Sequence, residues 1–137
     1  MRKQFVETAK WYGLEKTVYW EGEVPFDEVR NYYAQNHVFL FTSLRDSCPM
    51  QLVEAMAFGM PVVTLDLHGQ GLIVDTDRGF KCAVITPEVA IANLKDAILQ
   101  LYNDRALIER LSAGAFRFAA NQLWDKKIDS IVDQFYS

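Results

Sequence analysis

The sequence predicts an α/β fold in which a parallel sheet is flanked by helices. Three observations lead to this prediction. Short apolar runs alternate along the chain with segments whose apolar residues recur at helical spacing. The runs at 38–42 and 62–65 are almost continuously apolar, which is typical of strands buried on both faces. Half of the 137 residues are hydrophobic, which is enough to form the core of one domain.

The first part of the chain reads as helix, strand, helix. Residues 4–12 carry apolar side chains at helical spacing, and Gly13 is the expected stop. Residues 17–20 are β-branched and aromatic, which predicts a short strand. Residues 26–34 follow Pro25 and again present one apolar helical face. We therefore expect a strand between the first two helices.

The middle of the chain alternates strands with helices. The strand at 38–42 is followed by a helix at 51–58, which a glycine ends. Pro61 is tolerated at the point where the next strand, 62–65, begins, and the last strand covers 81–85. Because helices separate these strands, we expect parallel pairing with right-handed crossovers.

Three helices are expected after the last strand. Thr86 is a good N-cap, Pro87 suits the first helical position, and Asp104 caps the second helix. No repeat or linker interrupts the pattern, so we predict a single domain over 1–137. The apolar residues that mark a buried face on each helix are Ile91, Leu94, Ile98 and Leu101, then Leu107, Leu111, Ala115 and Phe118, then Trp124, Ile128, Val132 and Phe135.

Composition argues against several classes of protein. A net charge of −4 and a pI near 5.1 are unlike a duplex nucleic-acid binder, which needs a basic face. No apolar run reaches the roughly 18 residues of a membrane helix, and no secretion leader is visible, so we expect a cytoplasmic protein. Cys48 and Cys82 fit neither a disulfide framework nor a C-x-x-C site, and His37 with His68 makes no metal spacing. We expect no nucleic-acid partner, no metal and no other cofactor.

Residues 44–74 are the segment that carries chemistry. A strand–loop–helix junction is expected here, at the carboxyl edge of the sheet, where open α/β folds bind ligands. The free N–H groups at the helix start, from about Met50 to Val53, favour a phosphate. Asp46 precedes this helix and Glu54 lies within it, and carboxylates accept hydrogen bonds from sugar hydroxyls. A phosphate flanked by hydroxyls is the outline of a nucleotide-sugar.

The same segment resembles the E-x7-E region of retaining GT-B glycosyltransferases of the group 1, family-four-like type. This group includes sucrose and glycogen synthases and bacterial mannosyl- and glucosyltransferases. Further motifs follow in the family's order along nearly the whole chain. The matching residues are Val18-x-Trp20-x-Gly22, Val29-x-x-Tyr32-Tyr33, His37-Val38-Phe39-Leu40-Phe41-Thr42-Ser43, Asp46-x7-Glu54, Ala55-Met56-Ala57-x-Gly59-x-Pro61-Val62-Val63, Leu65-Asp66-Leu67-His68-Gly69-Gln70-Gly71, and Trp124 with Lys127.

The resemblance implies a Rossmann-like C-terminal donor domain and assigns roles to its residues. Glu54 would bind the ribose hydroxyls and Asp46 the hydroxyls of the donor sugar, which makes them the candidate catalytic pair. The partner would be a nucleotide-sugar such as a UDP- or GDP-sugar, and this group is generally independent of metals. The implied donor-binding residues are Ser47, Cys48, Pro49, Met50, Gln51, Leu52, Val53, Glu54 and Gly69.

Several residues depart from the family's pattern. Asp46 is one methylene shorter than the commoner Glu, and Pro49, in the triplet that replaces Gly-Phe-Gly, has no N–H to offer a phosphate. His68 stands where a Gly is usual, and Leu72 where a Glu is often found. The sugar, the base and the acceptor therefore remain open.

The resemblance also implies missing parts. The acceptor-binding N-terminal domain is absent, as are the first two strands of the donor domain with the Arg and Lys that clamp the diphosphate. The strand at 17–20 would then pair directly with 38–42 or with a second chain, which predicts a homodimer through an exposed strand edge. We expect an isolated chain without transferase activity. The parent enzyme would act in bacterial cell-surface polysaccharide or glycolipid synthesis, with any membrane association through the absent half.

Plainer interpretations stand beside these. Asp46 could act only as an anion at the helix start, Gly69 only as a turn residue, and His68 and Cys48 only as loop residues. A non-catalytic nucleotide-binding or assembly module is one alternative, in which changing Asp46 or Glu54 would leave ligand binding unaffected. A GT-B sugar-nucleotide epimerase is another, since fold alone does not determine function. A receiver-like domain lacks its acidic cluster here.

Overall fold

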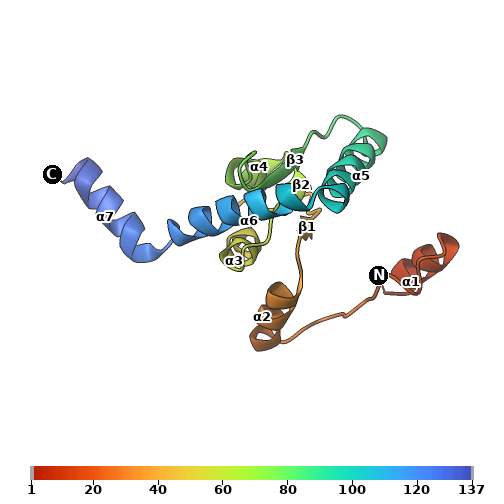
Figure 1. Cartoon of the computed structure of the whole chain (residues 1–137). Coiled ribbons are helices and arrows are strands. Elements are labelled where there is room, and N and C mark those ends of the chain that lie inside the picture. Colours follow the sequence, from red (N-terminus) through yellow and green to blue (C-terminus); the bar gives the residue numbers. More distant parts are fainter. Residues whose placement is uncertain (1, 137) are drawn as a thin grey trace. The chain divides into compact units, whose positions relative to one another are not determined.

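The computed structural model describes residues 2–136, and within them it shows seven helices and three strands (Figure 1). The chain forms two compact units, one up to Tyr32 and one from Tyr33 onward, so a single domain over 1–137 stays a prediction. In chain order the elements are α1 (Arg2–Trp11), α2 (Phe26–Gln35), β1 (Phe39–Phe41), α3 (Met50–Ala57), β2 (Val62–Leu65), α4 (His68–Ile73), β3 (Gly79–Cys82), α5 (Pro87–Asn103), α6 (Arg105–Ala120) and α7 (Trp124–Phe135).

The strand predicted at 17–20 is wrong. This segment bonds locally instead: the Thr17 hydroxyl and amide both donate to the Leu14 carbonyl, at 3.1 and 2.9 Å. The Trp20 ring packs on Phe5 of α1, with ring centroids 5.1 Å apart. Strand propensity reflects packing against neighbouring strands, and no strand of the described chain pairs with this segment to supply it. The strand edge through which we expected pairing is therefore not formed, and homodimerisation stays a prediction.

The second unit is built on a parallel sheet in the order β1-β2-β3. The parallel pairing was predicted, and β2 has the predicted bounds. The third strand, however, covers Gly79–Cys82 rather than 81–85. Gly79 pairs with Val62, and a Cβ at Gly79 would overlap the Val62 carbonyl oxygen, so only glycine allows the two backbones to pair this closely. The observed strand therefore begins two residues before the predicted one.

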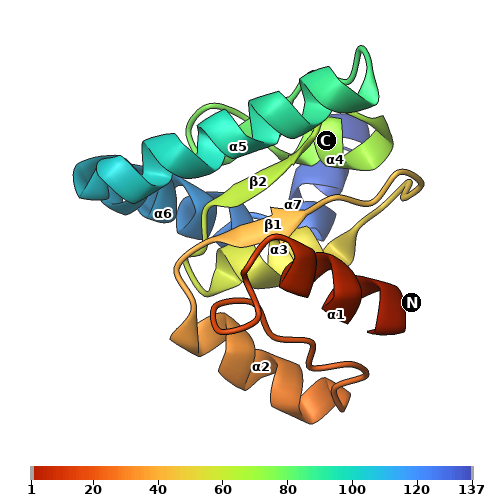
Figure 2. The ribbon, with the colours of Figure 1, turned by 90° about the vertical axis from the view of Figure 1, so that its right-hand side faces the viewer.

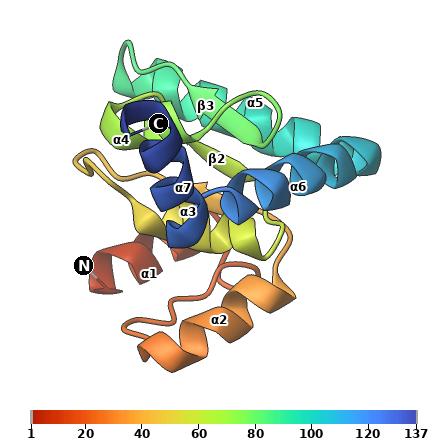
Figure 3. The same cartoon turned by 90° about the vertical axis from the view of Figure 1, so that its left-hand side faces the viewer.

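Two hydrophobic clusters cover the two faces of this sheet. Successive residues of β2 point to opposite faces, so Val62 belongs to one cluster and Val63 to the other. Figures 2 and 3 show α5 on one side of the sheet and α3 on the other. The first cluster comprises Leu52, Met56, Val62, Val74, Ala115 and Ala119, and the second Val63, Cys82, Ala97, Leu101 and Leu111.

The C-terminal helices confirm the predicted caps but not all of the predicted core. Thr86 accepts from the Val89 amide at 3.3 Å and Asp104 from the Leu107 amide at 2.9 Å, as their positions in sequence indicate. The prediction that α7 buries its apolar stripe is wrong, because Trp124 is 79% and Phe135 70% exposed and no residue described in α7 is buried. Helical spacing identifies the stripe but not what packs on it.

Candidate functional site

The candidate site lies where β1 leads through a loop into α3. Parallel strands carry their ligands at the carboxyl edge of the sheet, and α3 begins at Met50, just beyond that edge. Pro49 is buried and immediately precedes the helix, with φ −73°, a value its ring imposes on any proline. The predicted helix start is therefore confirmed to within one residue.

The start of α3 leaves backbone donors available. No side chain of residues 2–136 caps this helix. The Leu52 amide is already bonded to the Pro49 carbonyl at 3.1 Å, and the Cys48 amide to Asp46 at 3.1 Å, so these two predicted donors are engaged within the loop and the first turn. Met50 and Gln51 are exposed, and their amides belong to the first turn, which has no intrahelical partners. An anion at this end would thus meet mainly these two N–H groups.

Asp46 holds the loop that precedes α3. Its Oδ1 accepts from the amide of Cys48, two residues on, which is the hydrogen bond of an Asx turn. The side chain is half-buried. One carboxylate oxygen therefore bonds within the loop and not to an amide of α3, and a role toward a donor sugar stays a prediction.

Glu54 lies one turn into α3 and faces a buried tyrosine that the sequence analysis did not assign to the site. The Tyr33 hydroxyl donates to Glu54 Oε2 at 3.4 Å. Burial, and then the nearby Glu54 carboxylate, raise the pKa of Tyr33 above 10.0. In the sequence, the one signal for this contact is the Tyr32-Tyr33 pair, which places an aromatic residue on the buried face of the helix predicted at 26–34.

The short helix α4 packs against the same site, and its first four residues belong to the Leu65–Gly71 segment that resembles a family loop. Gly69 is buried, and its amide donates to the Asp46 carbonyl at 3.4 Å. A Cβ at Gly69 would overlap the Ser47 carbonyl oxygen and lie 3.2 Å from Cδ of Pro49. The role the structure gives Gly69 is thus close packing on the loop, and its contact with a donor stays a prediction.

A shallow pocket of about 400 Å³ opens beside the loop, lined by Arg45, Asp46, Ser47 and His68. His68 has φ 45°, in the left-handed region that glycine favours. This agrees with its place at a position where the family usually has glycine. The pocket combines a guanidinium, an imidazole, a hydroxyl and a carboxylate next to the start of α3, which suits a polar, phosphate-bearing ligand.

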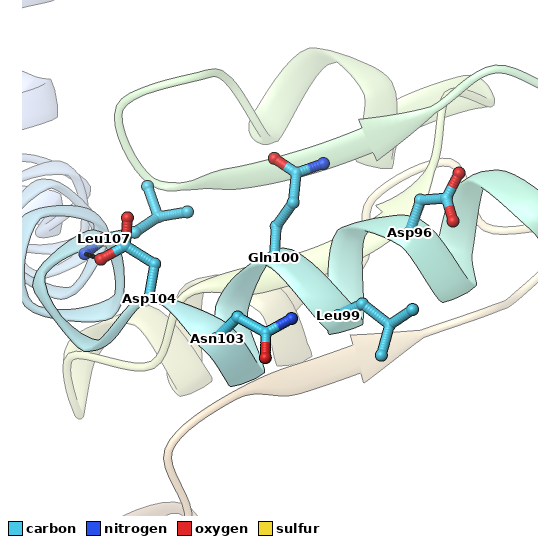
Figure 4. A pocket seen from close by; sticks show the side chains of 6 residues that line it. All are labelled: Asp96, Leu99, Gln100, Asn103, Asp104 and Leu107. Atoms are coloured by element: carbon cyan, nitrogen blue, oxygen red, sulfur yellow. Dashed lines mark hydrogen bonds between the residues drawn. The ribbon is translucent and has the colours of Figure 1, made fainter.

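A larger hollow of about 540 Å³ lies along α5 and the start of α6 (Figure 4). Its polar lining residues are carboxylates and amides, with no cation among the six that line it. Its residues are Asp96, Leu99, Gln100, Asn103, Asp104 and Leu107, none of which belongs to α3 or its preceding loop. Size alone therefore does not make it the site for an anionic ligand.

Residues 2–136 contain neither a metal-binding cluster nor a membrane-spanning helix. No group of three or more His, Cys, Asp or Glu side chains in this range could hold a metal ion. None of the helices described is long and apolar enough to cross a membrane. Cys48 and Cys82 are both free thiols, the first exposed and the second buried.

Known proteins resemble the chain in sequence. The family model described as "Glycosyl transferases group 1" matches residues 1–118. The D-inositol 3-phosphate glycosyltransferase of Streptomyces bingchenggensis (strain BCW-1) is 27% identical over 109 residues, which cover 80% of this chain and 23% of that protein. One component of human phosphatidylinositol N-acetylglucosaminyltransferase is 30% identical over 132 residues, 96% of this chain and 24% of that protein. The chain thus spans about a quarter of the length of the curated relatives it matches.

Solved structures share the fold. Sucrose-phosphate synthase from Thermosynechococcus elongatus matches with a TM-score of 0.79 and 20% identity, covering 98% of this chain and 33% of that one. S. aureus TarM, in complex with fondaparinux, alpha-GlcNAc-glycerol and UDP, matches with a TM-score of 0.78 and 19% identity, covering 99% and 27%. The parallel sheet flanked by helices is that of the C-terminal domains of GT-B glycosyltransferases.

Proposed function

Because the chain belongs to the glycosyl transferases group 1 family, we propose that it is the nucleotide-sugar-binding part of a glycosyltransferase. The whole enzyme would move a sugar from a nucleoside diphosphate sugar to a hydroxyl acceptor with retention of the anomeric configuration. It would use no metal. The acceptor would belong to a cell-surface polysaccharide or a glycolipid.

The observation that carries this proposal is the start of α3. Met50 and Gln51, both exposed residues, open a helix that no side chain in the described residues caps, so a diphosphate can take the place of a cap. Asp46 stands before this start and Glu54 one turn beyond it. Hydroxyl groups on both sides of the diphosphate would meet a carboxylate, as the ribose and the sugar of a nucleotide-sugar require.

The catalytic contribution of this donor-binding part would be mostly electrostatic. As the glycosidic bond breaks, negative charge builds on the leaving diphosphate, and helix N–H groups aimed at it lower the barrier without reorganising. The net charge of −4 opposes binding of a free nucleotide, so affinity rests on these local donors. We expect this chain to bind the donor and not to catalyse transfer by itself.

The relatives support the substrate class. One is named for D-inositol 3-phosphate and another for phosphatidylinositol, which both offer hydroxyl acceptors, and the TarM structure contains UDP. Of these two named molecules phosphatidylinositol is a lipid, and it supports a glycolipid acceptor over a storage glucan.

The test is a titration of the purified chain with UDP, GDP and ADP, followed by protein-observed NMR. The expected result is a set of shifts confined to residues 45–54, strongest for one of the three bases. Glu54→Ala should weaken these shifts, and Glu109→Ala, an exposed glutamate on α6, is the matched control. Equal affinities for the two variants would contradict the proposed role of Glu54. Shifts spread evenly over the surface would contradict the site.

A further inference from the structure

We infer that Tyr33 is a positioning residue, which holds the Glu54 carboxylate in the orientation that a ribose diol needs. The inference rests on the proposed function, because it concerns how that site selects its ligand. Tyr33 comes from α2 and Glu54 from α3, so the contact joins two helices that are separated in sequence by β1.

The Tyr33 ring is held on two sides. It is only 7% exposed. Phe39 of β1 meets it edge to face, with centroids 5.8 Å apart and planes at 82°, and Phe58 at the end of α3 meets it at 5.7 Å and 41°. Offset and edge-to-face pairs of this kind are the favoured aromatic geometries. The hydroxyl therefore has little freedom, and its position is determined by the sheet and by α3 itself.

The Tyr33 hydroxyl bonds to the carboxylate that we propose binds the ribose of the ligand. It donates to Oε2 of Glu54 at 3.4 Å, across a partly buried interface. Burial raises the pKa of Tyr33, and the Glu54 carboxylate raises it further, so the phenol stays protonated and remains a donor at neutral pH. A glutamate on a helix surface ordinarily samples several rotamers, and fixing one of them lowers the entropy that a ligand must remove. Oε1 and the second lone pair of Oε2 stay available to a diol.

The neighbouring tyrosine supplies a matched control. Tyr32 is 40% exposed, and its hydroxyl donates to Glu21 at 3.3 Å rather than to Glu54. Tyr32→Phe and Tyr33→Phe each remove one hydroxyl from adjacent positions of the same helix and keep the ring. A general effect of losing a tyrosine hydroxyl from α2 would appear in both variants. An effect that passes through Glu54 would appear in Tyr33→Phe alone.

The experiment compares UDP with 2′,3′-dideoxy-UDP. If GDP or ADP binds better than UDP, that nucleotide and its 2′,3′-dideoxy form are used instead. Tyr33→Phe should weaken binding of the ribonucleotide by about two- to threefold, the low end of the range for one net hydrogen bond, because the 3.4 Å contact is long. Binding of the dideoxy analogue should stay unchanged. Tyr32→Phe should change neither. In a Glu54→Ala background, Tyr33→Phe should have no further effect, because the group it positions is gone.

The outcomes separate the inference from the proposed function. If Glu54→Ala abolishes the preference for ribose and Tyr33→Phe preserves it, the proposed function stands and the inference is overturned. If the chain binds the two nucleotides equally, the ribose role of Glu54 and the inference are overturned and binding of the diphosphate stands. If it binds neither, the proposed function is overturned as well. A titration of the Tyr33 phenol by NMR adds a readout without ligand: Glu54→Gln should lower the pKa of Tyr33, and an unchanged value would overturn the coupling.

Discussion

Gly69→Ala should displace α4 from the loop that precedes α3. The added Cβ would overlap the Ser47 carbonyl oxygen, which is backbone and cannot rotate away, and would also lie 3.2 Å from Cδ of Pro49. The matched control is Gly71→Ala, two residues along the same short helix. There the Cβ would meet Oδ1 of Asp66, an exposed side chain that can turn toward solvent.

The difference can be worked out from these contacts. Overpacking costs about 1–3 kcal/mol, and a backbone obstacle places Gly69→Ala near the upper end. Alanine in place of a helical glycine recovers up to about 1 kcal/mol, which leaves Gly69→Ala about 2 kcal/mol less stable. For Gly71→Ala the same gain roughly cancels the cost of moving the Asp66 carboxylate. With a slope of roughly 2 kcal/mol per molar urea, the two unfolding midpoints should differ by about 1 M. Equal midpoints would refute the packing of α4 on the loop.

Three further outcomes are expected. Leu52→Ala should lower the free energy of unfolding by about 2–5 kcal/mol, because Leu52 is 0% exposed. Leu72→Ala, at an 86% exposed position, should change it by no more than about 0.5 kcal/mol. Equal values for the two variants in urea unfolding would contradict the assignment of Leu52 to the core. Asp46→Ala should lower stability by about 1 kcal/mol and Asp46→Asn by less, since Asn keeps an acceptor for the Cys48 amide; thermal unfolding measures both. Burial raises the pKa of the Cys82 thiol above 9.0. The stability that the protonated thiol contributes to the folded state is therefore fully present below pH 9.0 and is lost as the pH rises through the raised pKa. Alkaline pH should therefore destabilise the wild type more steeply than Cys82→Ala, and parallel profiles would contradict this.

The sequence predicted those parts of the fold that local signals determine. The bounds of β2 follow from a run of four residues buried on both faces, and α3, α5 and α6 follow from their starts and caps. Thr86 and Asp104 cap their helices by accepting hydrogen bonds from amides three residues later. Such contacts do not depend on how the helices pack. Local chemistry was sufficient there because the partners are neighbours in the chain.

The errors arose where the outcome depends on distant partners. Residues 17–20 have strand-forming side chains, yet a strand forms only beside another strand, and this segment bonds to α1 and its turn instead. The third strand was predicted at 81–85 but begins at Gly79, which pairs with Val62. The apolar stripe of α7 has the spacing of a core helix but stays exposed. Helix spacing and propensity carry no information about what lies opposite.

The strand–loop–helix junction was predicted, and the binding roles of its residues stay predictions. Asp46 lies in the loop between β1 and α3, and Glu54 lies within α3. The sequence could not show that Asp46 bonds the Cys48 amide, nor that Tyr33, 21 positions before Glu54, places its hydroxyl on that carboxylate. Such contacts depend on how α2 and α3 pack, which spacing along the chain does not encode.

The most direct test of the central claim follows the Met50 and Gln51 amides in ¹H–¹⁵N spectra during separate additions of UDP and uridine. If the start of α3 binds the diphosphate of a nucleotide-sugar, these two amides shift with UDP, saturate with it, and stay unmoved by uridine. Shifts at other helix starts, or equal responses to UDP and uridine, would contradict the account.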